Sequence, residues 1–105
     1  MEDPYTLSAD PPVLALAGEF DLSARDELTS ALLRVVTDPG TTTVVLDVSR
    51  TTFIDSEALA AVIIGVNAAR DLGKRFEITG ATGVVHRVMD VAGLLDLIDD
   101  HRHSP

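Results

Sequence analysis

The 105-residue sequence contains no cysteine. It therefore offers no disulfide framework, no thiolate metal site and no thiol redox switch, which suits a reducing compartment, and we expect a cytoplasmic protein. Tryptophan is also absent, and one tyrosine and three phenylalanines are the only aromatic residues. So few rings provide no platform on which nucleic-acid bases or sugars could stack, and we expect a mainly aliphatic core.

Positive charge is scarce as well. Eight lysine and arginine residues stand against 17 acidic residues, which gives a formal net charge of −9 at pH 7. A negative field of this kind repels phosphate backbones and anionic lipid surfaces. We therefore expect neither nucleic acid nor a membrane as a partner.

Long apolar runs and targeting signals are also missing. The longest apolar run, from Ala58 to Val66 with Gly65 included, falls far short of the roughly 20 residues that a membrane helix needs. The first residues, Met1 to Pro4, lack the basic start and the apolar stretch of a signal peptide. These features predict a soluble protein that is not exported by that route.

The hydrophobic content, in contrast, is sufficient for a core. Hydrophobic residues make up 46% of the sequence, and neither an internal repeat nor a low-complexity segment interrupts it. We expect a single domain over residues 1–105, with its core at about 5–99 and a flexible tail at 100–105.

Strand-like and helix-like segments alternate along the chain. Short apolar or alternating runs predict strands, and apolar residues three or four positions apart predict amphipathic helices. This order predicts an α/β fold with a mixed sheet of about four to five strands, parallel crossovers and helices packed on it. The predicted strands are 5–8, 13–17, 44–48 and 74–80, and the predicted helices begin at Ser23, Asp55–Ser56 and Thr82 and end near 38–40, 72–73 and 93.

The pattern also predicts how individual segments are buried. The segment 44–48 is apolar almost throughout, which predicts a central strand covered on both faces. The segments 18–22 and 49–52 are interpreted as connections, whereas 94–98 fits either a short strand or a helical turn. The residues predicted to form the buried side of the second helix are Leu59, Val62, Ile63, Val66 and Ala69.

The start of the second predicted helix is the main candidate site. Asp55 and Ser56 stand where an apolar strand passes into an apolar helix, and either side chain can cap the free N–H groups of the first turn. A phosphate on Ser56 would meet the same N–H groups and the positive end of the helix dipole. If the second and third strands are parallel neighbours, the acidic residues Glu19 and Asp21 emerge at the same sheet edge. On these grounds alone, a mere cap and a functional site are equally good interpretations.

The sequence gives little support for an enzymatic, metal-binding or nucleotide-binding site. Ser56 is not part of a Gly-x-Ser-x-Gly motif, and the histidines lie in the third helix (His86) and the tail (His101, His103), so we do not expect an enzyme. The tail histidines are better explained by solvation than by metal binding. The segment Gly80–Gly83 lacks the spacing of phosphate-binding loops, which leaves only a weak indication of a nucleotide site. We expect no metal and no cofactor in this chain.

Several segments, in their order and spacing, resemble the anti-anti-sigma proteins (anti-sigma factor antagonists) of the STAS domain family. The resemblance runs from about Val13 to about Asp99, and it rests on the ordered set more than on any single motif. The segments are Gly18–Asp21, Val44–Asp47, Phe53–Ser56, Gly80 and Met89–Leu94.

The resemblance implies a small α/β domain that binds an anti-sigma factor, itself a serine kinase, and so frees a sigma factor for transcription. Ser56 matches the serine that the kinase phosphorylates, Asp55 matches the acid before it, and Asp21 matches a position beside it that helps partner binding. ATP and magnesium would belong to the kinase. The implied partner-binding residues are Glu19, Asp21, Asp55, Ser56 and Glu57.

The chain departs from the family pattern directly after the serine. The family commonly continues with Ser or Thr and then Gly-Leu-Gly, whereas here Glu57-Ala58-Leu59-Ala60 follows. Glu57 adds negative charge where the γ-phosphate of ATP would approach. An alternative is therefore a stand-alone STAS-type module that regulates a transporter or a signalling assembly, binds a nucleotide or small anion and is not phosphorylated. The sequence leaves weak homodimerisation open.

Overall fold

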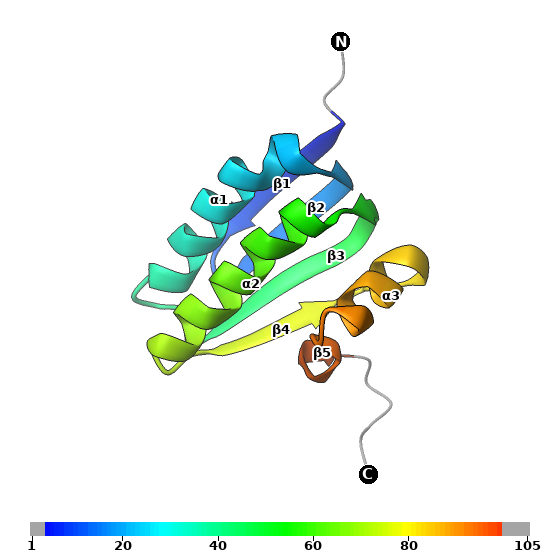
Figure 1. Cartoon of the computed structure of the whole chain (residues 1–105). Coiled ribbons are helices and arrows are strands. Elements are labelled where there is room, and N and C mark those ends of the chain that lie inside the picture. Colours follow the sequence, from blue (N-terminus) through cyan, green and yellow to red (C-terminus); the bar gives the residue numbers. More distant parts are fainter. Residues whose placement is uncertain (1–3, 100–105) are drawn as a thin grey trace.

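The computed structural model describes residues 4–99, which form an α/β domain built on one five-stranded sheet (Figure 1). The strands stand in the order β1-β2-β3-β4-β5, with β1 antiparallel to β2 and all other neighbours parallel. This arrangement confirms the predicted mixed sheet with parallel crossovers. The strands are β1 (Tyr5–Asp10), β2 (Val13–Phe20), β3 (Thr43–Ile54), β4 (Arg75–Thr79) and β5 (Ile98–Asp99).

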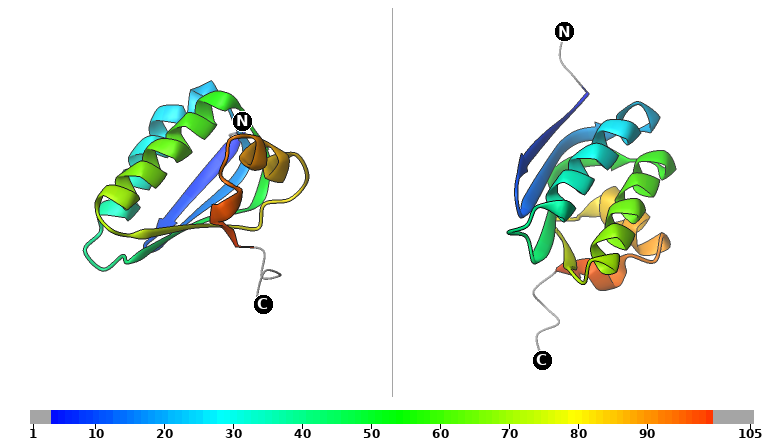
Figure 2. Two further views of the ribbon diagram at one scale, coloured as in Figure 1. Left: turned by 60° about the horizontal axis from the view of Figure 1, so that its bottom comes forward. Right: turned by 90° about the vertical axis from the view of Figure 1, so that its left-hand side faces the viewer.

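The helices lie on one face of the sheet (Figure 2). The first two run side by side across it, and the third lies beyond the carboxyl end of β4 (Figure 1). Two single turns of 3₁₀ helix, η1 (Leu22–Ala24) and η2 (Leu95–Leu97), precede α1 and β5. The helices are α1 (Arg25–Thr37), α2 (Ser56–Asp71) and α3 (Gly83–Val91).

The core lies between the sheet and these helices. On β3, Val44, Leu46 and Val48 are fully buried, whereas the alternate residues Val45 and Asp47 are only half-buried. β3 is therefore central, as predicted, but helices cover only one of its faces. The run is apolar almost throughout because the residues on the uncovered face of β3 are only weakly polar, and not because helices cover that face.

Three strands, β1, β2 and β3, are longer than predicted, and β2 and β3 are longer because polar segments interpreted as connections belong to the sheet. β2 continues to Phe20 and β3 to Ile54, and these two buried residues are direct partners in the parallel register. The hydroxyl of Thr51 donates to the carbonyl of Leu16 at 3.1 Å, so its polar group is satisfied within the sheet. Strand pairing and these side-chain hydrogen bonds outweigh the polar composition of 49–52.

The buried side of α2 differs from the prediction at one position. Ile63 is 36% exposed, while Ala58, Ala61 and Gly65 face inward. A Cβ atom on Gly65 would stand 3.1 Å from Cδ1 of Leu32 on α1, so the two helices approach closely through small residues. Gly65 thus faces α1, whereas Ile63 is at the surface.

The end of the described chain contains both elements that the pattern of 94–98 allowed. The N–H of Leu97 donates to the carbonyl of Leu94 in η2, and β5 then pairs with β4. The predicted flexible tail at 100–105, with His101 and His103, lies outside the described residues. Within residues 4–99, none of the helices has the length and hydrophobicity that a membrane crossing requires.

Candidate functional site

The candidate site forms where β2 and β3 end side by side. Phe20 pairs with Ile54, and the N–H of Asp55 donates to the carbonyl of Phe20 at 3.0 Å. The second and third strands are thus parallel neighbours, which is the condition under which Glu19 and Asp21 were expected at this edge. Asp21 and Asp55 each follow a paired residue, so both leave the same edge of the sheet, which is where α/β folds place their sites.

Asp55 caps α2. Its Oδ1 atom accepts a hydrogen bond from the N–H of Ala58 at 2.9 Å, and its carbonyl accepts from the N–H of Leu59 at 2.9 Å. Ser56 is the first residue of the helix and is exposed. Within the described part of the chain, its hydroxyl makes no hydrogen bond. Of the two candidate caps, Asp55 performs the structural role, and the Ser56 hydroxyl is left accessible.

Asp21 has a structural role of its own at the start of η1. Its Oδ1 atom accepts from the Ser23 hydroxyl at 2.6 Å and from the Ser23 N–H at 2.9 Å. These hydrogen bonds, with the hydroxyl contributing most, hold the pKa of the Asp21 carboxyl below its ordinary value. The prediction that the first helix begins at Ser23, as its cap, was wrong, because Asp21 caps η1 and α1 begins only at Arg25.

Glu57 is paired across the two helix starts. Nη1 of Arg25 lies 3.0 Å from Oε1 of Glu57, and both side chains are about half exposed. Nε of Arg25 also lies 3.6 Å from Oδ1 of Asp26. Sequence reasoning missed Arg25, because nothing in the local pattern indicates that the first turns of α1 and α2 are adjacent.

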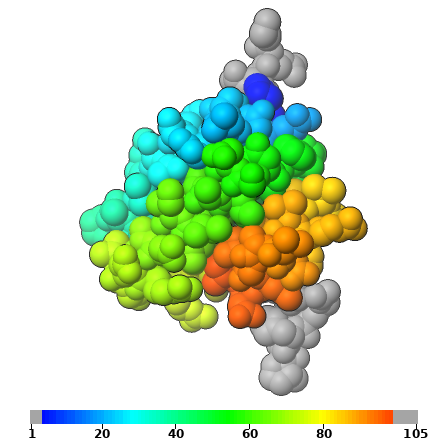
Figure 3. Space-filling view, viewed as in Figure 1, coloured from blue at the N-terminus to red at the C-terminus, as the bar shows by residue number. Residues whose placement is uncertain are grey.

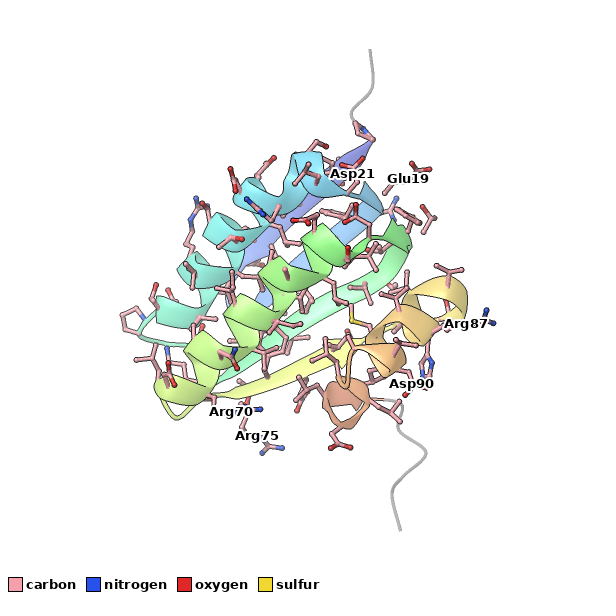
Figure 4. The ribbon with its side chains drawn as sticks, viewed as in Figure 1. Glu19, Asp21, Arg70, Arg75, Arg87 and Asp90 are labelled. Atoms are coloured by element: carbon pink, nitrogen blue, oxygen red, sulfur yellow. The ribbon has the colours of Figure 1, made fainter. Side chains whose placement is uncertain are left out.

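Glu19 lies at the outer edge of the site. Its N–H donates to the carbonyl of Pro4 at 2.9 Å, while its side chain is exposed and projects from the end of β2, close to Asp21 (Figure 4). The five residues predicted for partner binding therefore stand at one end of the sheet, on β2, in the connection to η1 and at the start of α2.

Several apolar side chains on the elements that carry the site are exposed, and the sequence did not predict this. Leu22 on η1 is 59% exposed, and Phe53 at the end of β3 is 44% exposed. Ile63 and Ile64, two turns along α2 from Ser56, are also exposed. Exposed apolar side chains near polar residues are typical of protein interfaces.

The glycine segment before α3 has a packing explanation. Gly80 has φ +80°, and a Cβ atom there would stand 2.6 Å from Cβ of Ser49. Thr82 is the N-cap residue of α3, but its side chain makes no capping hydrogen bond. Close approach to β3 thus accounts for Gly80 without a phosphate loop. Within residues 4–99, no three His, Asp or Glu side chains gather in a way that could hold a metal ion.

A family model described as "Mlab, STAS domain" matches residues 5–99. This range contains every strand and helix of the structure and all residues of the candidate site. No curated protein matches the chain.

Solved structures show the same fold. The anti-sigma factor antagonist SpoIIAA in its unphosphorylated form has a TM-score of 0.76 and 19% identity, over 90% of this chain and 85% of that chain. An anti-sigma factor antagonist from Mycobacterium paratuberculosis has a TM-score of 0.73 and 20% identity, over 90% and 80%. A sulfate transporter family protein from Wolinella succinogenes has a TM-score of 0.70 and 16% identity, over 90% and 82%. At these identities the likeness establishes the fold alone.

Proposed function

Because the chain belongs to the STAS domain family, we propose that it is an anti-sigma factor antagonist, which binds an anti-sigma factor with serine kinase activity and so frees a sigma factor for transcription. Proteins of this fold are generally non-catalytic binding modules. In this proposal the chain contributes a binding surface and a phosphoacceptor, and the kinase contributes ATP and magnesium.

The proposal rests on the different roles of Asp55 and Ser56. Asp55 caps α2, so the helix start does not depend on the serine. The Ser56 hydroxyl is exposed and makes no hydrogen bond within residues 4–99. A kinase could therefore modify it without first breaking the structure around it.

Phosphorylation would act through charge at the interface. A phosphate adds about −1.5 to −2 charges, and here it would stand between Asp55 and Glu57, on the α2 face that includes Ile63 and Ile64. A partner that covers these apolar side chains would have to desolvate the phosphate, which costs more than the contacts gain. In the proposed switch, the unmodified surface binds and the phosphorylated surface releases the partner.

Arg25 changes the effect of Glu57, the residue at which the chain departs from the family pattern. Its guanidinium compensates the Glu57 carboxylate at 3.0 Å, so an approaching γ-phosphate would meet an ion pair instead of an isolated negative charge. The pair supports Ser56 as a phosphoacceptor despite the glutamate that follows it.

Incubation with the candidate anti-sigma kinases of the host and Mg-ATP tests the proposal. We expect one kinase to bind the chain and to label Ser56, with no label on the Ser56→Ala variant. Ser30→Ala, which removes another exposed serine on α1, is the matched control and should be labelled normally. Binding without any label on Ser56 would be consistent with the antagonist role but would refute the phosphorylation switch. If none of the kinases binds the chain, the antagonist role and the switch are both refuted.

The likeness to a sulfate transporter family protein favours a second candidate, a STAS-type module that regulates a transporter or signalling assembly and binds a nucleotide or small anion at the start of α2. Two observations weigh against it. Arg25 is already paired with Glu57, and the chain carries a net charge of −9. Thermal shifts with GTP, ATP, sulfate and phosphate distinguish the candidates, because only the second predicts stabilisation by an anion.

A further inference from the structure

A groove lies on the surface far from Ser56. It has a volume of about 690 Å³ and lies between the last turn of α2, the start of β4 and η2. In Figure 3 the yellow-green end of α2 lies at the lower left and the orange-red segment with η2 to its right. α2 separates this groove from Ser56 by roughly 20 Å at 1.5 Å per residue.

The floor of the groove is apolar. Val66 and Phe76, with exposed fractions of 6% and 7%, are the most buried residues that line it. Leu97 and Ile98 are partly buried beside them, and Leu95 is exposed at the edge. Such a floor can accommodate one or two aliphatic side chains of a ligand.

A backbone edge of β4 lies along the same groove. β5 pairs with β4 only at Ile78 and Thr79, because η2 carries the preceding residues away from the sheet. On the other edge of β4, the N–H of Arg75 donates to the carbonyl of Thr42 beside β3. Successive residues of a strand direct their N–H and C=O groups to opposite edges. The N–H and C=O of Phe76 therefore point into the groove, ahead of the two residues that β5 covers.

Three basic and two acidic side chains line the groove, Arg70, Lys74 and Arg75 against Glu77 and Asp96, so its net charge is positive, unlike that of the whole chain. Arg70 and Arg75 line the groove and extend at the same end of the molecule (Figure 4). Within residues 4–99, Arg70 forms no ion pair, and Arg75 has only a long contact of 4.0 Å with Glu77. The nearby Lys74 is engaged differently, since its ammonium donates to two backbone carbonyls at the end of α1. Two guanidinium groups are thus available for carboxylates.

We propose that this groove binds an extended segment of a partner protein that alternates aliphatic and acidic residues. The segment adds a short strand along β4 at residues 75–77, in line with β5, and hydrogen-bonds to the backbone of Phe76. Its aliphatic side chains lie on Val66 and Phe76, and its carboxylates pair with Arg70 and Arg75. A strand edge that β5 leaves unpaired at Phe76, beside an apolar floor, favours a peptide over a small amphipathic anion, which would use the arginines but not the edge.

Peptide selection tests the proposal without knowledge of the partner. A phage-displayed library of random decapeptides is selected on the intact chain, after depletion on an Arg70→Ser/Arg75→Ser variant. The recovered peptides are synthesised, and their affinities are measured by fluorescence anisotropy. Arg87→Ser on α3 is the matched control, because it removes an exposed arginine outside the groove.

We expect recovered peptides that alternate aliphatic and acidic residues. Each arginine substitution in the groove should weaken binding about tenfold, as expected for a lost charge-assisted hydrogen bond, and Arg87→Ser should change it less than about twofold. Hydrogen exchange should slow at the Phe76 amide when the peptide binds, with no change at Ser56.

Three results would overturn the proposal. The first is the recovery of no peptide, or only of peptides that bind the double variant equally well. The second is binding that leaves exchange at Phe76 unchanged, because strand addition must protect that amide. The third is that no peptide is recovered while decyl phosphate binds in a way that depends on Arg70 and Arg75, since the groove would then be a site for small amphipathic anions. None of these readouts involves phosphorylation of Ser56, so the antagonist proposal is tested separately.

Discussion

Nη1 of Arg25 lies 3.0 Å from Oε1 of Glu57 and joins the first turn of α1 to the first turn of α2. The two residues are separated by 32 positions in the sequence. The pair stands beside Ser56, so it affects the charge that a kinase meets at the proposed phosphoacceptor.

Removal of Arg25 should therefore slow the phosphorylation of Ser56. In the Arg25→Gln variant, Glu57 loses its compensating charge and repels the γ-phosphate of ATP, and we expect the initial rate of phosphate transfer by the cognate kinase to fall several-fold. The double variant Arg25→Gln/Glu57→Gln removes both charges and should restore the rate. An unchanged rate in Arg25→Gln would show that the ion pair has no influence on the reaction. Stability is a poor readout, because half-exposed ion pairs contribute less than about 1 kcal/mol.

Substitution of the α2 cap should lower the free energy of unfolding more than substitution of the α3 cap does. Asp55→Ala removes the hydrogen bond to the Ala58 N–H and should lower the free energy of unfolding by about 1 kcal/mol. Thr82→Ala is the matched control, because Thr82 occupies the cap of α3 without a side-chain hydrogen bond. Chemical denaturation of both variants measures the difference. Equal losses would mean that the Asp55 hydrogen bond contributes nothing.

The pKa of Asp21 should depend on the Ser23 hydroxyl. Hydrogen bonds from Ser23 lower this pKa in the folded protein, so their contribution to stability is present above the pKa of the unfolded chain and is lost as the pH falls through the folded value. Ser23→Ala removes the larger cause, and a carboxyl titration by NMR should then give a higher Asp21 pKa. If the pKa of Asp21 is the same in both proteins, the hydroxyl is not its cause.

Gly80 should tolerate a methyl group far less than Gly73 does. Both have positive φ, which costs an alanine about 1 to 2 kcal/mol. At Gly80 the added Cβ would also meet Ser49 at 2.6 Å, whereas at Gly73 it meets nothing within 4 Å. Gly80→Ala should therefore lower the melting temperature clearly more than Gly73→Ala, and Ser49→Gly should recover part of the difference. A similar effect at both positions would contradict the close contact with β3.

The sequence predicted those parts of the fold that local patterns determine. The second helix was placed correctly because an apolar strand, a cap and a terminal glycine mark its limits, and β3 was recognised as central from its β-branched run. The extension of β2 to Phe20 and of β3 to Ile54 could not be predicted, since polar residues there are held by pairing between the strands. Ile63 was assigned to the core because periodicity does not reveal the close approach of Gly65 to Leu32.

The candidate site was only partly predictable for the same reason. Asp21, Asp55 and Ser56 were identified from their positions after strands and at a helix start. Sequence reasoning could not decide which of Asp55 and Ser56 caps the helix, because both side chains can do so. Arg25 and the exposed Leu22 and Phe53 became relevant only when the fold brought η1, β3 and α2 together.

The most direct test of the account is affinity capture from extracts of the native host with three forms of the chain: unmodified, Ser56→Ala and Ser56→Asp. Mass spectrometry identifies the captured proteins and the modification state of Ser56. We predict that the unmodified and Ser56→Ala forms retain the same anti-sigma kinase, that Ser56→Asp does not, and that chain recovered without the kinase carries phosphate on Ser56. Equal capture of one partner by all three forms, with Ser56 unmodified throughout, would contradict the account.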